Sequence, residues 1–113
     1  MMIYFCSVVA PTVSDLSPLE QNVTSPNEAI FTCSATGRPR PSISWYRVEI
    51  NGSRTLLADD QSDEMMLGER EILSTLTVEP TSATDAAEYV CVASNVVDND
   101  EMIANLTVYG ILQ

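Results

Sequence analysis

The sequence predicts an all-β domain, built as a sandwich or barrel of short strands. Apolar and polar residues alternate with a period of two in five segments, at residues 28–35, 42–47, 74–78, 87–93 and 104–109. Such alternation is typical of strands with one buried face. Turn signals separate these segments, and no window between them shows a helical period. The 113 residues are close to the commonest size of a single domain.

Each alternating segment predicts which side chains point into the core. The inward set is Ala29, Phe31, Cys33 and Ala35, then Ile43 and Trp45, then Leu76 and Val78, then Ala87, Tyr89, Cys91 and Ala93, and finally Ala104, Leu106 and Val108. The weaker stretch 56–66 is expected to hold two short edge strands around an acidic loop. Asn51-Gly52 predicts a hairpin with a type I′ turn, in which both residues take a positive φ.

The most specific signal is a set of spacings. Cys33 precedes Trp45 by 12 residues and Cys91 by 58, Tyr89 stands two before Cys91, and Asp85 stands four before Tyr89. Over residues 11–110 this pattern resembles an immunoglobulin domain. The stretches "TGRPRPSISWYR" and "DAAEYVCVASN" resemble the intermediate (I-set) class found in adhesion molecules and receptor ectodomains.

The resemblance implies a two-sheet Greek-key sandwich pinned by a Cys33–Cys91 disulfide. It also implies that Trp45 packs against this bond and that the Tyr89 hydroxyl ties back to the backbone, with Asp85 and Leu76 completing the core signature. Alternation points both cysteines inward, so a bond between the sheets is geometrically natural. The alternative is a pair of free core cysteines, as in intracellular muscle domains of this family.

Charge and composition exclude several functions. Net charge is −11, with five arginines, no lysine and no histidine. This acid excess disfavours binding to nucleic acid or anionic lipid. After the opening run no apolar segment approaches the roughly 20 residues that cross a bilayer, so no direct membrane insertion is expected.

Catalytic and cofactor chemistry also lacks candidate residues. Without histidine there is no imidazole base for a Ser-His or Cys-His pair. The acidic runs 59–64 and 98–101 are expected in loops, without an apolar pocket to raise a carboxyl pKa. They offer oxygen ligands for calcium as an alternative, but neither has the spacing of an EF-hand loop. We predict a protein that is not an enzyme and has no cofactor and no metal.

Three N-glycosylation sequons point to a secreted context. They begin at Asn22, Asn51 and Asn105. Asn22 is expected in an early loop, Asn51 at a hairpin tip, and Asn105 on the outward side of the last strand. An exposed asparagine can carry a glycan, so we expect at least one of the three to be used.

Strand parity also predicts a binding face. The family topology places the strands at 42–47, 87–93 and 104–109 in one sheet, whose outer face would expose an apolar patch of Tyr46, Val90, Val92 and Ile103. The alternative is that valine and isoleucine stand there for their β-propensity alone. A second candidate is one end of the domain, where Arg38 and Arg40 are expected near Asp98, Asp100 and Glu101.

The ends of the chain are assigned separately. Residues 1–10 predict an apolar leader-like or disordered segment, and 111–113 a short tail. Removing the first segment would remove Cys6 and leave the pair that the sandwich needs.

Together these features predict an extracellular recognition module of a cell-adhesion or receptor chain with several domains, whose partner is another protein. The alternatives are a soluble secreted or matrix protein that binds a ligand, and an intracellular structural domain of the muscle type. Contact between two copies through the acidic loops is disfavoured by charge repulsion.

Overall fold

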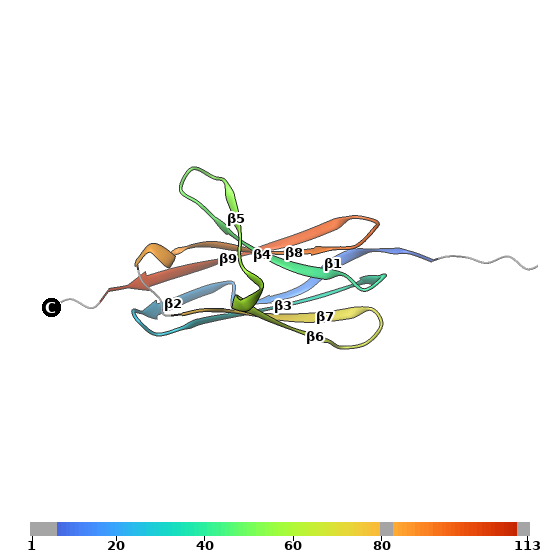
Figure 1. The fold of residues 1–113 in the computed structure, drawn as a ribbon, viewed down its shortest axis with the longest axis horizontal. Helices are drawn as coiled ribbons and strands as arrows, with labels where there is room; N and C mark the ends of the chain where they lie inside the picture. The colour runs from blue at the N-terminus through green and yellow to red at the C-terminus, as the bar shows by residue number, and fades with distance from the viewer. Residues whose placement is uncertain (1–6, 80–82, 111–113) are drawn as a thin grey trace, which may run out of the picture.

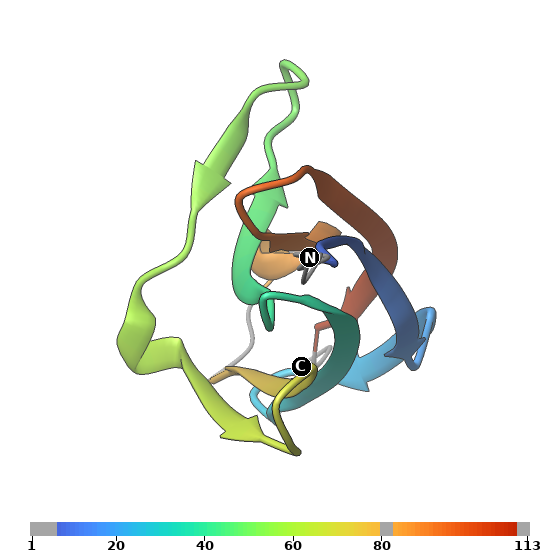
Figure 2. The same ribbon diagram turned by 90° about the vertical axis from the view of Figure 1, so that its right-hand side faces the viewer.

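The computed structural model describes residues 7–79 and 83–110, which form two β-sheets packed face to face (Figures 1 and 2). In chain order the strands are β1 (Val9–Ser17), β2 (Glu20–Thr24), β3 (Ala29–Arg38), β4 (Ser42–Val48), β5 (Arg54–Leu56), β6 (Ser62–Met66), β7 (Glu71–Val78), β8 (Ala87–Ser94) and β9 (Asn99–Tyr109). Two short 3-10 helices, η1 (Asp59–Gln61) and η2 (Ala83–Asp85), lie in the connections.

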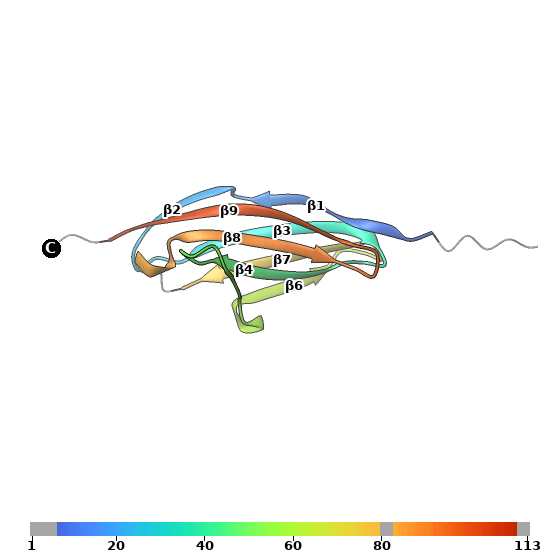
Figure 3. The same ribbon diagram turned by 90° about the horizontal axis from the view of Figure 1, so that it is seen from above.

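The four-stranded sheet has the order β1-β3-β7-β6, and the five-stranded sheet has the order β2-β9-β8-β4-β5. Only β2 and β9 pair in parallel among the described strands; the remaining pairs are antiparallel. The chain passes repeatedly from one sheet to the other. Figure 3, seen from above, shows β2, β9, β8 and β4 side by side. The all-β, two-sheet sandwich predicted from the sequence is therefore confirmed.

The core lies between the sheets and follows the predicted alternation. Phe31 and Leu76 are fully buried on the four-stranded sheet, and Tyr89 and Ala104 face them from the other. The rings of Phe31 and Tyr89 stack with their centres 5.8 Å apart. β3 and β7 bury every second side chain, because successive residues of a strand point to opposite faces.

A disulfide and a hydrogen bond, next to each other in the core, connect the two sheets. Cys33 on β3 and Cys91 on β8 form a disulfide with a Cα–Cα distance of 6.5 Å. Beside it, Trp45 Nε1 on β4 donates a 2.8 Å hydrogen bond to the Oγ of Ser74 on β7. Trp45 is the cross-strand neighbour of Cys91, and Ser74 is that of Cys33. The disulfide thus joins β3 to β8, and the hydrogen bond joins their neighbours β7 and β4.

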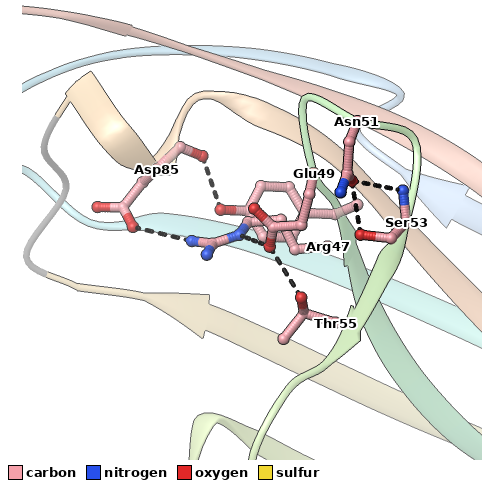
Figure 4. Close-up of polar contacts among 7 residues, drawn as sticks. Arg47, Glu49, Asn51, Ser53, Thr55 and Asp85 are labelled. Atoms are coloured by element: carbon pink, nitrogen blue, oxygen red, sulfur yellow. Dashed lines mark hydrogen bonds and ion pairs between the residues drawn. The ribbon is translucent and has the colours of Figure 1, made fainter.

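Tyr89 ties the start of β8 to the preceding turn. Its hydroxyl donates a 2.7 Å hydrogen bond to the Asp85 carbonyl oxygen, and Arg47 Nη1 lies 4.0 Å from an Asp85 carboxylate oxygen (Figure 4). Burial raises the pKa of the Tyr89 phenol to about 12, and the nearby Asp85 carboxylate adds to the rise. The Tyr89 phenol therefore keeps its proton to a higher pH than an exposed tyrosine does.

This raised pKa predicts a loss of stability in alkali. The unfolded chain releases the phenol proton near pH 10 and the folded one near pH 12, so this contribution is complete below about pH 10 and is lost as pH rises to about 12. Urea unfolding across this range should show a fall in the free energy of unfolding for the native chain. The Tyr89→Phe variant should show a flatter profile. An equal slope in both proteins would contradict this assignment.

At the end where β1 begins, one asparagine side chain holds three segments together. Asn95 Nδ2 donates to the carbonyl oxygens of Val9 and Pro39, at 2.9 and 3.0 Å. Val9 also pairs with Arg38, so β1 begins two residues before the boundary predicted at residue 11. The predictions for residues 1–6, including Cys6, and for 111–113 lie outside the described residues.

Gly37 is packed tightly at this same end. A Cβ at this position would lie 3.0 Å from Pro41 Cγ, 3.2 Å from Asn95 Nδ2 and 3.2 Å from Pro11 Cα. We expect Gly37→Ala to lower the free energy of unfolding by about 1–3 kcal/mol, since a backbone atom cannot move aside as a side chain can. Urea denaturation measures this, with Gly110→Ala as the control because that position is open. An unchanged free energy of unfolding for Gly37→Ala would show that the segments around Pro11, Pro41 and Asn95 can move apart to make room for the Cβ.

The β4–β5 hairpin projects from the sandwich (Figure 2) and differs from its predicted turn. Glu49 accepts from the Gly52 N–H at 2.9 Å, and its own N–H donates to the Ser53 carbonyl at 2.7 Å. Gly52 has a φ of 87°, whereas Asn51 has no positive φ. The loop thus has three residues and one left-handed glycine, and the type I′ prediction is wrong. Asn51 Oδ1 instead accepts hydrogen bonds from the Ser53 N–H and hydroxyl (Figure 4).

Candidate functional site

The outer surface of β5, β4, β8 and β9 carries the predicted apolar patch. Register places Leu56, Tyr46, Val90 and Ile103 in one row across these strands, with Val92 in the next row. Leu56 is 60% exposed and Ile103 42%, while Tyr46 and Val92 are half-buried. We call the surface formed by Tyr46, Leu56, Val92 and Ile103 the candidate face.

The prediction that Val90 is exposed on this surface is wrong. Its exposed fraction is 0%, although its side chain stands on the outer side of the sheet. Val90 belongs to a central strand, between Tyr46 on one side and Ile103 on the other. Larger neighbours in the same row leave it no access to water, so it supports the face from below.

An ion pair crosses the same row. Arg54 on β5 makes two hydrogen bonds to the Glu101 carboxylate on β9, at 3.1 and 2.6 Å, although β4 and β8 lie between the two strands. Arg54 lies in the row of Glu88, and Glu101 in the row of Val92. The pair therefore spans the intervening row, which contains Val90.

This ion pair affects both protonation and access to the face. Hydrogen bonding to Arg54 lowers the pKa of Glu101, and the same contact raises the pKa of Arg54. Both side chains are substantially exposed, at 40% and 42%. An exposed pair adds little to folding stability. Its main consequence is steric: the two side chains lie across the row that contains Val90, and so limit which apolar atoms of the face a partner can contact.

The second predicted site, at the end near Arg38 and Arg40, has a different arrangement. Arg40 Nη1 donates 2.7 Å to the Gly68 carbonyl oxygen, and Asp100 accepts from the Val13 N–H at 2.8 Å. Glu101 pairs with Arg54 instead of an arginine of this end. Among the described residues, no ion pair joins Arg38 or Arg40 to the acidic residues at 98–101, which were expected near them.

All three sequon asparagines are exposed and belong to the five-stranded sheet or its hairpin. Asn51 is at the hairpin tip and Asn105 on the outer side of β9, as predicted. Asn22 lies within β2, so its expected loop position is wrong. The sequence signal missed this strand because Glu20–Thr24 is short and polar on its outer side.

Several residues that shape the site were not found by pattern reasoning. Strand alternation predicted that Leu76 and Val78 point inward. Applied two residues earlier, the same alternation would have placed Ser74 in the core. Arg54 and Leu56 lie on a three-residue strand that is too short to show a period. Their position above β4 and β8 depends on pairing across the sheet, which no local signal reports.

Within residues 7–79 and 83–110, no group of three or more acidic, cysteine or histidine side chains is arranged to hold a metal ion. Neither short helix of this part has the length or apolar character needed to cross a membrane.

Comparison with known proteins agrees with this architecture. The family model described as "Immunoglobulin domain" matches residues 10–95. The human matrix-remodeling-associated protein 5 is 30% identical over 98 residues, covering 87% of this chain and 3% of that protein. Mouse protein sidekick-2 is 31% identical over 104 residues, covering 90% and 4%. The chain thus spans only a small part of either relative.

Among solved structures, the I-band fragment I67-I69 from titin has a TM-score of 0.70 at 25% identity, covering 92% of this chain and 34% of that one. The agreement extends over both sheets because it covers nearly the whole described chain. With its match to the family model over most of its length, this chain belongs to the immunoglobulin domain family.

Proposed function

We propose that the chain is a non-catalytic, extracellular protein-recognition module, of the I-set class, within an adhesion or receptor chain of several domains. The observation that carries the proposal is the candidate face. It combines four apolar side chains with an exposed ion pair on a rigid sheet, and apolar patches bordered by polar groups often mark interfaces. A basic or neutral protein partner suits a chain of net charge −11.

Three further features support this role. The buried Cys33–Cys91 disulfide favours an oxidising compartment. The described chain enters and leaves the sandwich at opposite ends (Figure 1), which suits domains joined in a row. The relatives include proteins named for cell adhesion, such as mouse neural cell adhesion molecule 1, 33% identical over 84 residues.

The alternatives are a soluble secreted or matrix protein that binds a ligand, and an intracellular structural domain. The likeness to titin favours the second of these, although it speaks mainly for the shared fold. Staining of intact and permeabilised cells with an antibody to this chain separates the cases. Signal on intact cells, with an oxidised Cys33–Cys91 pair in non-reducing peptide mapping, is expected. Signal only after permeabilisation would refute the extracellular proposal.

The candidate face is tested with a matched pair of substitutions. Ile103→Arg is expected to reduce binding of a fluorescent tetramer of this chain to cultured cells at least tenfold, since it buries a charge in the interface. Ile30→Arg is the control, because Ile30 is 40% exposed against 42% for Ile103 but lies on the four-stranded sheet. An equal loss in both variants, with both folded by circular dichroism, would contradict the assignment.

A further inference from the structure

A hollow lies at the end of the five-stranded sheet near the β4–β5 hairpin. It has a volume of about 610 Å³ and is lined by parts of β2, β9, β8 and the end of β4. Two of the three sequon asparagines, Asn22 and Asn105, are among its lining residues. The third, Asn51, is not.

Asn105 occupies the middle of this hollow. On one side it is paired in register with Glu20 on β2, and on the other side with Glu88 on β8. Side chains directly opposite each other in adjacent strands have Cβ atoms about 5 Å apart. Any group attached to the Asn105 amide therefore begins between two carboxylates.

The hollow contains hydrogen-bond acceptors without donors. The carboxylates of Glu20 and Glu88 are exposed and make no hydrogen bond or ion pair with any described residue. Val48 and Ile50 add an apolar wall. A ligand with several hydroxyl or amide donors and one apolar side matches this lining, and the N-acetylglucosamine at the base of an N-linked glycan has these features.

We propose that Asn105 carries an N-linked glycan and that its first sugars lie in this hollow. The inference rests on the proposed passage through the secretory pathway. In the attachment step the Asn105 Nδ2 attacks the anomeric C1 of a polyprenyl-diphosphate-linked oligosaccharide. The C1–N bond forms, the C1–O bond to the diphosphate breaks, the polyprenyl diphosphate leaves with the electron pair, and Nδ2 loses one proton to a base.

The seated sugar has consequences for the domain. Its hydroxyl and acetamide N–H groups donate to Glu20 and Glu88, and its apolar side packs on Val48 and Ile50. It links β2, β9, β8 and the β4–β5 hairpin, and so stabilises this end of the sheet. It also borders the candidate face, because Ile103 is two residues before Asn105 on the same outer side.

The test uses the chain secreted from glycosylation-competent animal cells. Glycopeptide mass spectrometry is expected to find the glycan at Asn105. Asn105→Gln should lower the melting temperature by about 4 °C or more relative to the native glycoprotein. Asn51→Asp is the control: it removes the sequon but keeps a side-chain oxygen that can accept from Ser53, so losing a glycan from the exposed tip should leave the melting temperature unchanged. In the same proteins expressed without glycosylation, Asn105→Gln should have no such effect.

A second variant tests the contact itself. Glu88→Ala should abolish most of the difference in melting temperature between glycosylated and unglycosylated chains, whereas Glu64→Ala, on the other sheet, should preserve it. A glycan at Asn105 that gives no difference, or one that Glu88→Ala leaves intact, overturns the seated sugar while the extracellular function stands. If mass spectrometry finds a glycan on Asn51 but none on Asn105, the proposed glycan at Asn105 is wrong while the extracellular function stands. A secreted chain with all three sequons unmodified, which binds a basic peptide in the hollow, would assign this place to a cationic partner.

Discussion

Replacing both Cys33 and Cys91 by alanine is expected to lower the free energy of unfolding by about 4 kcal/mol. The two residues are 58 apart in sequence, and their bond removes much of the conformational freedom of the unfolded chain. Both are fully buried, so two small cavities add to the loss. Urea denaturation of the double variant and of the native chain measures the difference. With a domain stability of about 5–15 kcal/mol, such a loss changes the folded fraction in the cell.

The control for this prediction is the native chain treated with a reductant. It should lose nearly as much stability as the double variant, because both lack the covalent link and differ only in two sulfur atoms. A loss below about 2 kcal/mol in both would mean that the sandwich gains little from the bond. That outcome would favour the intracellular alternative, in which the core cysteines remain reduced.

Trp45→Ala is expected to have a comparable effect, of about 4 kcal/mol. The indole is 3% exposed and fills the core beside the disulfide. Its removal leaves a cavity and also leaves the buried Ser74 hydroxyl without its donor. Thermal or urea unfolding measures the loss. Trp45→Phe should cost less, because the smaller ring still fills part of the space.

A double-mutant cycle separates the hydrogen bond from the packing. Ser74→Ala alone should cost about 1–3 kcal/mol, since it leaves the indole N–H buried without an acceptor. In the Trp45→Phe background the same change should cost little, because the hydrogen bond is already absent. Equal costs of Ser74→Ala in both backgrounds would show that Ser74 acts through its volume and not through Trp45.

The sheet faces show how far alternation alone is informative. It separated inward from outward side chains on β3, β4, β7, β8 and β9, because a half-buried strand repeats every two residues whatever its neighbours are. It placed Tyr46 and Ile103 outward correctly. For Val90 it reported the direction of the side chain but not its exposure, which depends on the size of the residues beside it on β4 and β9.

The turns and short strands show where local signals become weak. Asn51-Gly52 correctly marked a hairpin, yet the loop has three residues and uses a single positive φ at Gly52. Either loop is compatible with these two residues, so the pairing of β4 with β5 selects between them. β5 has only three residues and β2 only five, too few for a reliable period.

Residue types and their spacing were enough to predict the all-β class, the two inward cysteines, and the tryptophan and tyrosine beside them. These features depend on residue type and spacing along one chain. Three contacts become visible only in the folded chain: Arg54 reaches Glu101, Trp45 donates to Ser74, and Asn105 stands between Glu20 and Glu88. Each of these contacts joins strands that are distant in sequence, and strand order and register, which bring them together, result from the packing of the whole sandwich.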